Sequence, residues 1–137
     1  MENTFVGERS DRLEKLNKIS EITNPYPAKT NRTHIVSEVL ENFSQLEEKK
    51  TELVLDGRIM SLRSHGNLSF ARLKDASGEI QLAFSKNEMG AEEYKSFSKL
   101  VDMADFLEVS GTCFLTHKGE QSILVKTYRF LSKALSP

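Results

Sequence analysis

Cysteine and long apolar runs are scarce in this sequence, and each scarcity excludes a class of protein. The single cysteine, Cys113, excludes a disulfide framework and stands in the strand-like run LEVSGTCFL, where we expect a small buried residue. No apolar run approaches the roughly 20 residues of a membrane span. The first residues, MENTFVGERS, lack the basic and then apolar segments of a secretory signal. We therefore expect a cytoplasmic protein with no membrane partner.

An excess of charge of either sign is also missing. The 19 lysines and arginines nearly balance the 20 aspartates and glutamates, so the formal charge is −1. This argues against a protein that binds long nucleic acid regardless of sequence, because such proteins are usually basic. A small and specific nucleic-acid site remains compatible with the charge.

The residue types that carry out catalysis or hold metals are scattered. No Cys/His group has metal spacing, no phosphate-binding glycine loop is present, and the histidines are far apart: His34, His65 and His117. Asp75 and Glu79 are better explained by a turn and by an ion pair with Lys74. We expect no catalytic residue, no metal site and no cofactor in this chain.

The hydrophobic pattern predicts a helical extension over residues 1–50 and a β-rich domain over 51–133. Ser10 is expected to cap a first helix that ends at NPYP, residues 24–27. Its narrow apolar stripe consists of Leu13, Leu16, Ile19 and Ile22. Thr33 is expected to cap a second helix before a charged linker over residues 45–51. The buried side of that helix is expected to hold Ile35, Val36, Val39, Leu40 and Phe43.

Five strands and one helix are expected in the β-rich part. Strand-like segments lie near residues 52–62, 67–74, 79–85, 106–116 and 121–131. Residues 89–101 predict a helix with one apolar side: Tyr94, Phe97, Leu100 and Val101. This order is that of a mainly β fold with flanking helices, the five-stranded Greek-key barrel called the OB-fold. Gly57 inside the first strand is expected to permit the bend that lets one strand serve both sides of the barrel.

The second and third strands predict a hairpin with one apolar and one polar face. A turn centred on residues 76–77 places Asp75 opposite Gly78 and puts on one face Ala71, Leu73, Ile80, Leu82 and Phe84. The other face then carries Phe70, Arg72, Lys74, Glu79 and Gln81. An aromatic ring beside cations and an amide is what single-stranded nucleic acid requires. The alternative is that a helix or loop simply covers Phe70.

Segments along nearly the whole chain resemble one family in order and spacing. They are RLEKLNKISEITNPYP (12–27), RTHIVSEV (32–39), GRIMSLRSHGNLSFARLKDASGEIQL (57–82), KGEQSILV (118–125) and LSKALSP (131–137). They resemble the N-terminal region of bacterial-type lysyl-tRNA synthetases, the class II lysine–tRNA ligases. The leading helix with its NPYP favours these over the aspartyl and asparaginyl enzymes. The resemblance implies an OB-fold domain that reads the anticodon of lysine tRNA, whose bases are mainly uridines.

The resemblance also implies roles for individual residues. Phe70 matches the family's ring that stacks on the central anticodon base, and Gln81 matches the glutamine that hydrogen-bonds this base. Arg63 matches an arginine that contacts the same base or the adjoining backbone. Glu120 matches an acidic residue that helps to discriminate the anticodon. To these the hairpin adds Arg72 as an RNA-binding residue.

The family's catalytic part is not expected in this chain. Residues 134–137 match the start of the linker to a catalytic domain, so the chain alone is not expected to be an enzyme. The resemblance implies a parent ligase that uses ATP and magnesium in that missing domain and can form a homodimer. Two basic positions of the family are occupied here by Asn67 and Glu79, which weakens the expected attraction for phosphate.

Two other functions remain open from the sequence. One is a general OB-fold protein that binds single-stranded nucleic acid. The other is a dimerisation or interaction domain that does not read RNA and associates through the apolar stripe of the first helix. Substitution of Phe70 by alanine should weaken RNA binding by about 1–3 kcal/mol in an anticodon reader and in a general nucleic-acid binder alike. An interaction domain, in contrast, would bind no RNA at the outset.

Overall fold

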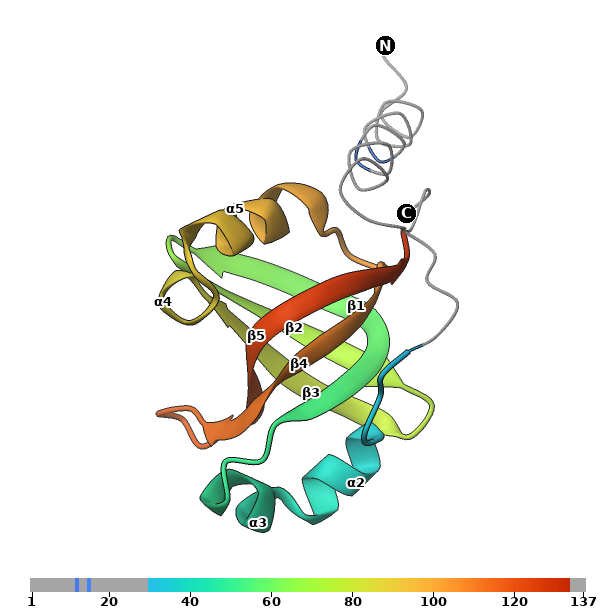
Figure 1. The fold of residues 1–137 in the computed structure, drawn as a ribbon, viewed down its shortest axis with the longest axis vertical. Helices are drawn as coiled ribbons and strands as arrows, with labels where there is room; N and C mark the ends of the chain where they lie inside the picture. Colours follow the sequence, from blue (N-terminus) through green and yellow to red (C-terminus); the bar gives the residue numbers. More distant parts are fainter. Residues whose placement is uncertain (1–11, 13–14, 16–29, 134–137) are drawn as a thin grey trace.

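A closed five-stranded barrel forms the centre of the computed structural model, which describes residues 30–133 together with Arg12 and Lys15 (Figure 1). Its strands are β1 (Leu53–His65), β2 (Leu68–Asp75), β3 (Gly78–Ser85), β4 (Phe106–Leu115) and β5 (Gln121–Ser132). Around the barrel they follow the order β1-β2-β3-β5-β4. Every pairing is antiparallel except that of β3 with β5, which is parallel. The predicted OB-type barrel is confirmed.

The long strand β1 changes its partner near its middle. Its first half pairs with β4 and its second half with β2, and Gly57 lies at the changeover. A Cβ atom at Gly57 would stand 2.7 Å from the Leu73 side chain and 2.7 Å from the Lys74 carbonyl oxygen. Only glycine therefore allows β2 to approach this closely. The irregular pairing itself lies between Ile59 and Ser61, so the expected bend begins at Gly57 and continues into a bulge.

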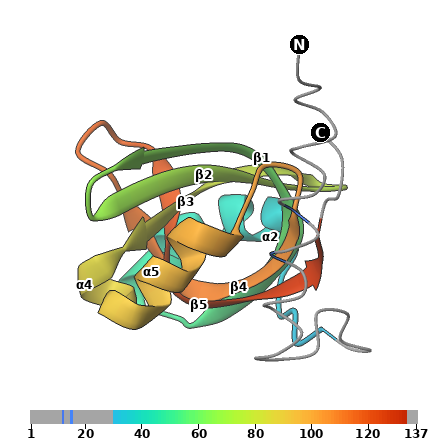
Figure 2. The ribbon, with the colours of Figure 1, turned by 90° about the horizontal axis from the view of Figure 1, so that it is seen from above.

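Helices close the two ends of the barrel (Figures 1 and 2). At one end lie α4 (Lys86–Met89) and α5 (Ala91–Leu100), and at the other α2 (Val36–Glu41) and α3 (Phe43–Glu48). The expected apolar side of α5 is confirmed, since its residues and the one after it are buried: Tyr94, Phe97, Leu100 and Val101. Phe97 stacks on Phe84 of β3 with 3.9 Å between the ring centroids. No helix among the described residues is long and apolar enough to span a membrane.

Two predictions for the segment before the barrel are wrong. Ile35, not Thr33, is the N-cap of α2, and the Thr33 hydroxyl instead accepts a hydrogen bond from the Val54 N–H at 2.9 Å. The expected linker over residues 45–51 begins with the last residues of α3. Asn42 leaves the helical conformation between α2 and α3, and this break is absent from the apolar spacing on which the prediction rested. The first helix expected after Ser10, with its apolar stripe, lies outside the described residues.

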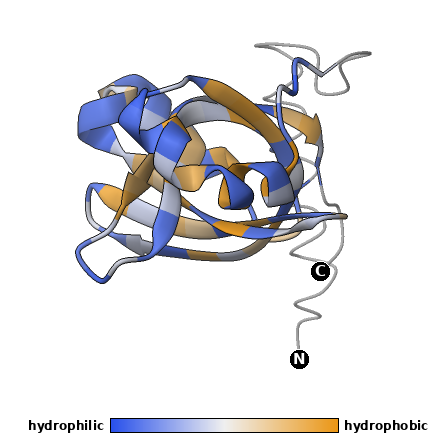
Figure 3. Cartoon of the chain, turned by 90° about the horizontal axis from the view of Figure 1, so that it is seen from below, coloured by the Kyte–Doolittle hydropathy of each residue, from blue (hydrophilic) through white to orange (hydrophobic). Residues whose placement is uncertain are grey.

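One hydrophobic core fills the barrel and extends under the helices. Side chains of all five strands contribute to it, and Val36, Val39 and Phe43 join it from α2 and α3. Figure 3 shows hydrophobic and hydrophilic residues alternating along the strands, as expected for one buried and one outward face. Cys113 is 5% exposed, and burial raises the pKa of its thiol to about 11. The prediction of a small buried cysteine is confirmed.

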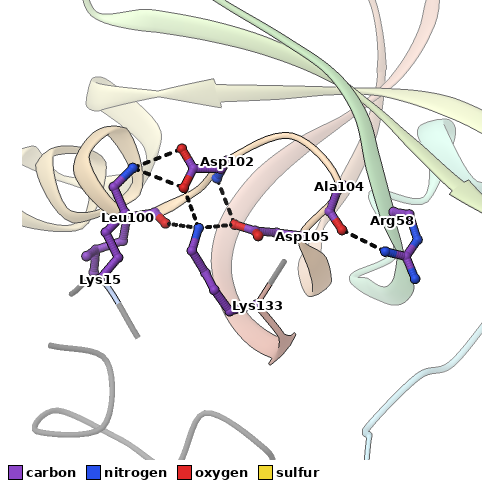
Figure 4. A network of polar contacts seen from close by, with 7 residues as sticks. All are labelled: Lys15, Arg58, Leu100, Asp102, Ala104, Asp105 and Lys133. Carbon is purple, nitrogen blue, oxygen red and sulfur yellow. Dashed lines mark hydrogen bonds and ion pairs between the residues drawn. The ribbon is translucent and has the colours of Figure 1, made fainter. Parts of the chain in front are cut away.

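A buried polar cluster ties the end of β5 to the loop between α5 and β4 (Figure 4). The Nζ of Lys133 lies 2.6 Å from Asp102 and 2.7 Å from Asp105, and it donates to the carbonyl of Leu100 at 2.8 Å. The Lys15 Nζ contacts Asp102 at 2.9 Å. Burial by itself raises the pKa of Asp102, but hydrogen bonds from Lys133 and Lys15 outweigh it, and the pKa is lowered. Residues from distant parts of the chain meet here, which the sequence pattern did not indicate.

Candidate nucleic-acid interface

The hairpin of β2 and β3 has the register that the sequence predicted. Phe70 lies opposite Ala83, Arg72 opposite Gln81, and Asp75 opposite Gly78. The predicted apolar face is buried: Ala71, Leu73, Ile80, Leu82 and Phe84. Phe70, Arg72 and Gln81 are half-buried on the opposite, outward face. Register follows from burial, because a shift of one residue would expose the entire apolar set.

Asp75 holds the turn between these strands and also the start of α2. Its Oδ1 accepts hydrogen bonds from the N–H groups of Ser77 at 2.8 Å and Gly78 at 3.1 Å, and its Oδ2 from the N–H of Val36 at 2.9 Å. Burial raises the pKa of Asp75, but these hydrogen bonds and one from the Ser77 hydroxyl outweigh it, so the pKa is lowered. The predicted turn role of Asp75 is confirmed.

The prediction of an ion pair between Lys74 and Glu79 is wrong. These residues are cross-strand neighbours, but the Glu79 carboxylate pairs with Arg72 at 3.8 Å. The long guanidinium group reaches diagonally across the strands, which a rule based on directly opposite residues does not anticipate.

The five predicted RNA-binding residues lie together around two adjoining open hollows. The first, of about 330 Å³, is lined by Ser61, Leu62, Arg63, Phe70, Ala71, Arg72 and Gln81. The second, of about 600 Å³, is lined by Arg63, His65, Phe70, Gln81, Thr116, His117, Lys118 and Glu120. Because both hollows share Arg63, Phe70 and Gln81, we call them together the Phe70 hollow. Residues of β1, β2, β3 and the turn between β4 and β5 thus converge on one surface.

The ring of Phe70 lies on the outward face of the sheet next to an exposed arginine. Its ring lies beneath the Arg63 guanidinium, whose central carbon is 5.4 Å from the ring centroid. Arg63 is exposed and is the cross-strand neighbour of Phe70. The alternative of a ring covered by a helix or loop is wrong, because Phe70 lines both hollows.

A short chain of hydrogen bonds runs from Gln81 through Ser122 to the backbone of Glu120. The Gln81 Nε2 donates to the Ser122 hydroxyl at 3.1 Å, and this hydroxyl donates to the backbone carbonyl of Glu120 at 3.2 Å. The Glu120 carboxylate accepts from the Arg72 guanidinium at 2.9 Å. Two predicted residues, Arg72 and Glu120, are therefore joined by an ion pair, and a third, Gln81, is held by a serine that sequence reasoning missed.

Sequence reasoning also missed the residues that the two turns bring to the hollow. His65 ends β1, and Thr116, His117 and Lys118 belong to the turn between β4 and β5. The signal that could have found them is the fold itself, because OB barrels bind oligonucleotides with the loops after strands one and four as well as with the sheet face. Among the described residues, no group of three or more His, Cys, Asp or Glu side chains is placed to hold a metal ion.

The sequence relatives agree with this geometry. Residues 53–131 match the family described as the OB-fold nucleic acid binding domain of the tRNA anticodon type. The chain is 42% identical, over 98% of its length, to the lysine–tRNA ligase of Carboxydothermus hydrogenoformans, covering 27% of that protein. It is 42% identical to that of Syntrophomonas wolfei over 92% of its length, covering 25% of that protein. It is 39% identical to that of a Nostoc species over 94% of its length, again covering 25%.

The chain spans about a quarter of the length of the ligases that it matches. Its matched segment is the nucleic-acid-binding domain rather than the catalytic part of such a ligase. This protein therefore belongs to the family of OB-fold nucleic acid binding domains of the tRNA anticodon type, as a homologue of the corresponding region of lysine–tRNA ligases.

Proposed function

We propose that this chain binds the anticodon loop of lysine tRNA and reads its central uridine in the Phe70 hollow. The observation that carries the proposal is the convergence of Phe70, Arg63, Arg72, Gln81 and Glu120 on one open surface. The relatives named lysine–tRNA ligases support the choice of this tRNA over other single-stranded nucleic acids.

Stacking on Phe70 is the main source of affinity in this proposal. A base that lies on the Phe70 ring displaces the Arg63 guanidinium, which is exposed and therefore free to swing outward and cover the other side of the base. Stacking of one base on an aromatic side chain contributes about 1–3 kcal/mol of binding free energy. The guanidinium can then add hydrogen bonds to the base or to the neighbouring phosphate.

Acidic neighbours of Arg72 reduce the electrostatic contribution to RNA binding. The Arg72 guanidinium is shared between the carboxylates of Glu120, at 2.9 Å, and Glu79, at 3.8 Å. These acidic partners offset part of its attraction for phosphate. We therefore expect a shallow dependence of affinity on salt, since each phosphate contact neutralised by a cation steepens it by about one unit of slope.

The wider setting of the domain belongs to the same proposal. As part of a lysine–tRNA ligase in the cytoplasm, this chain would bring the tRNA to a catalytic domain that uses ATP and magnesium outside the described fold. The parent would form a homodimer, with the segment before the barrel as the candidate contact.

Two phenylalanines provide a matched test. Phe106 resembles Phe70 in being half-buried beneath an arginine, with the central guanidinium carbon of Arg58 5.7 Å from its ring centroid, but it lies outside the Phe70 hollow. We expect Phe70→Ala to weaken binding of a lysine-tRNA anticodon stem-loop by about 1–3 kcal/mol and Phe106→Ala to leave it unchanged. Equal effects of the two substitutions, or no binding by the unaltered chain, would contradict the proposal and favour an interaction domain.

A further inference from the structure

Ser122 is buried next to Gln81, a residue that lines both parts of the Phe70 hollow. Its side chain has no exposed surface. Gln81 and Ser122 are register partners in the parallel pairing of β3 with β5, which helps to close the barrel. The fold itself therefore sets the serine hydroxyl beside the glutamine amide.

The chemistry of the hydroxyl fixes which end of the amide it meets. A serine hydroxyl has a single hydrogen, and here this hydrogen is donated to the Glu120 carbonyl oxygen, which can only accept. The hydroxyl must then accept from its other neighbour, so the atom of Gln81 that contacts it at 3.1 Å is the Nε2 donor. The amide oxygen of Gln81 is thereby directed away from Ser122. Within the described part of the chain, that oxygen accepts no hydrogen bond.

A flipped amide would lose one hydrogen bond. With the Gln81 oxygen toward Ser122, the hydroxyl would have to donate to it and release the Glu120 carbonyl, which would keep only its bond from the Thr116 N–H at 3.1 Å. The observed orientation makes two hydrogen bonds at the Ser122 hydroxyl and the flipped one makes one. One net hydrogen bond corresponds to a preference of about two- to twelvefold.

The orientation of the amide determines which base edge fits. Gln81 presents an acceptor oxygen beside the second hydrogen of its own Nε2, and Arg72, its cross-strand neighbour, lines the same hollow and can supply a second donor there. This sequence of donor, acceptor and donor complements uracil, whose N3–H donor stands between two carbonyl acceptors. Cytosine has an acceptor at N3 and an amino group in place of one carbonyl. It would bring acceptor against acceptor at the Gln81 oxygen and donor against donor at one of the two flanking groups.

We propose that Ser122 is a positioning residue that gives the hollow its preference for uracil over cytosine by fixing the amide of Gln81. The inference rests on the proposed function, since it concerns the base read in the same hollow. Ser122 lines neither part of the hollow and acts through Gln81.

The test compares the ratio of dissociation constants for two lysine-tRNA anticodon stem-loops that differ only in a central cytidine or uridine. Ser122→Ala should lower this preference for uridine by about two- to twelvefold, because the amide then flips freely. Ser122→Thr, which keeps a hydroxyl, should restore it. Ser69→Ala is the control for a lost buried hydroxyl: Ser69 is equally buried and bonds to Tyr94 and Ser64 instead. It should leave the ratio unchanged even where it lowers the melting temperature.

A second measurement needs no substitution. In the unaltered protein, proton NMR should show a nuclear Overhauser effect between the Gln81 side-chain amide hydrogens and the β hydrogens of Ser122, and its absence would overturn the inference. A normal uridine preference in Ser122→Ala would also overturn the inference while leaving the proposed function intact. Failure of the unaltered chain to bind either loop would overturn the proposed function itself.

Discussion

Replacing Lys133 by methionine removes one charge from the buried cluster at the end of β5 and leaves the shape of the side chain nearly unchanged. The Nζ of Lys133 has no exposed surface and contacts two carboxylates, at 2.6 Å and 2.7 Å. Removing one partner of a buried ion pair costs about 3–5 kcal/mol, because charge is left in a medium that solvates it poorly. The side chain of Asp102 is 24% exposed and keeps Lys15, whereas that of Asp105 is fully buried. We therefore expect the lower end of this range, about 3 kcal/mol.

Thermal unfolding followed by circular dichroism measures the effect. For a domain of this size, about 3 kcal/mol corresponds to a fall in melting temperature of roughly 10–15 °C. Lys126→Met is the matched control on the same strand, because Lys126 pairs with Glu52 at 2.6 Å but both side chains are largely open to water, 42% and 70% exposed. Screening by solvent should leave the melting temperature of this control unchanged. Equal melting temperatures for Lys133→Met and the unaltered protein would refute the reasoning.

The dependence of the Lys133 effect on pH has a definite sign. The pKa of Asp102 in the folded protein is below its ordinary value of 3.8. A carboxyl group whose pKa is lowered by folding stabilises the folded protein at pH values above the pKa of the unfolded chain. This stabilisation is lost as the pH falls through the pKa of the folded protein. The difference in stability between Lys133→Met and the unaltered protein should therefore narrow below about pH 3.8. A constant difference down to pH 2 would show that Asp102 contributes nothing to it.

Three further predictions concern the barrel and its turn. Gly111→Ala should destabilise the fold by about 1–3 kcal/mol in chemical denaturation, because a Cβ atom would clash with the backbone carbonyl oxygen of Leu124. Gly78→Ala, whose Cβ would have only an ordinary 3.6 Å contact, should cost little by comparison. Cys113 should not react with a thiol reagent at neutral pH until the protein unfolds, since burial raises its pKa to about 11; rapid labelling of the folded chain would contradict this. Asp75→Ala should cost about 1–2 kcal/mol through loss of its bonds to the turn and to Val36, and this cost should shrink as acid protonates Asp75 in the unaltered protein. Equal stability of the two proteins at neutral pH would count against this role.

Local periodicity was sufficient to predict the barrel and the hairpin that forms the floor of the site. The faces of β2 and β3 follow from alternation, and the register from the need to bury one complete face. The placement of Phe70, Arg72 and Gln81 on the outward face depended only on these two rules. The apolar side of α5 could also be predicted, because it depends on helical spacing alone.

Contacts between segments far apart in the sequence could not be predicted in this way. Ser122 meets Gln81 because β5 lies parallel to β3, and no pattern in either strand specifies that neighbour. Thr33 bonds to β1 instead of capping α2, so a tertiary contact replaced a local one. The pairing of Glu79 with Arg72 depends on the reach of one long side chain, which strand alternation does not describe.

The most direct measurement of the central claim is a titration of the isotope-labelled chain with the lysine-tRNA anticodon stem-loop, followed residue by residue through its backbone amide NMR signals. We expect the largest shifts at Arg63, Phe70, Gln81 and in the turn over residues 116–120, all around the Phe70 hollow. Shifts centred on the separate hollow lined by Arg58 and Phe106, or no shifts at all, would contradict RNA reading in the Phe70 hollow.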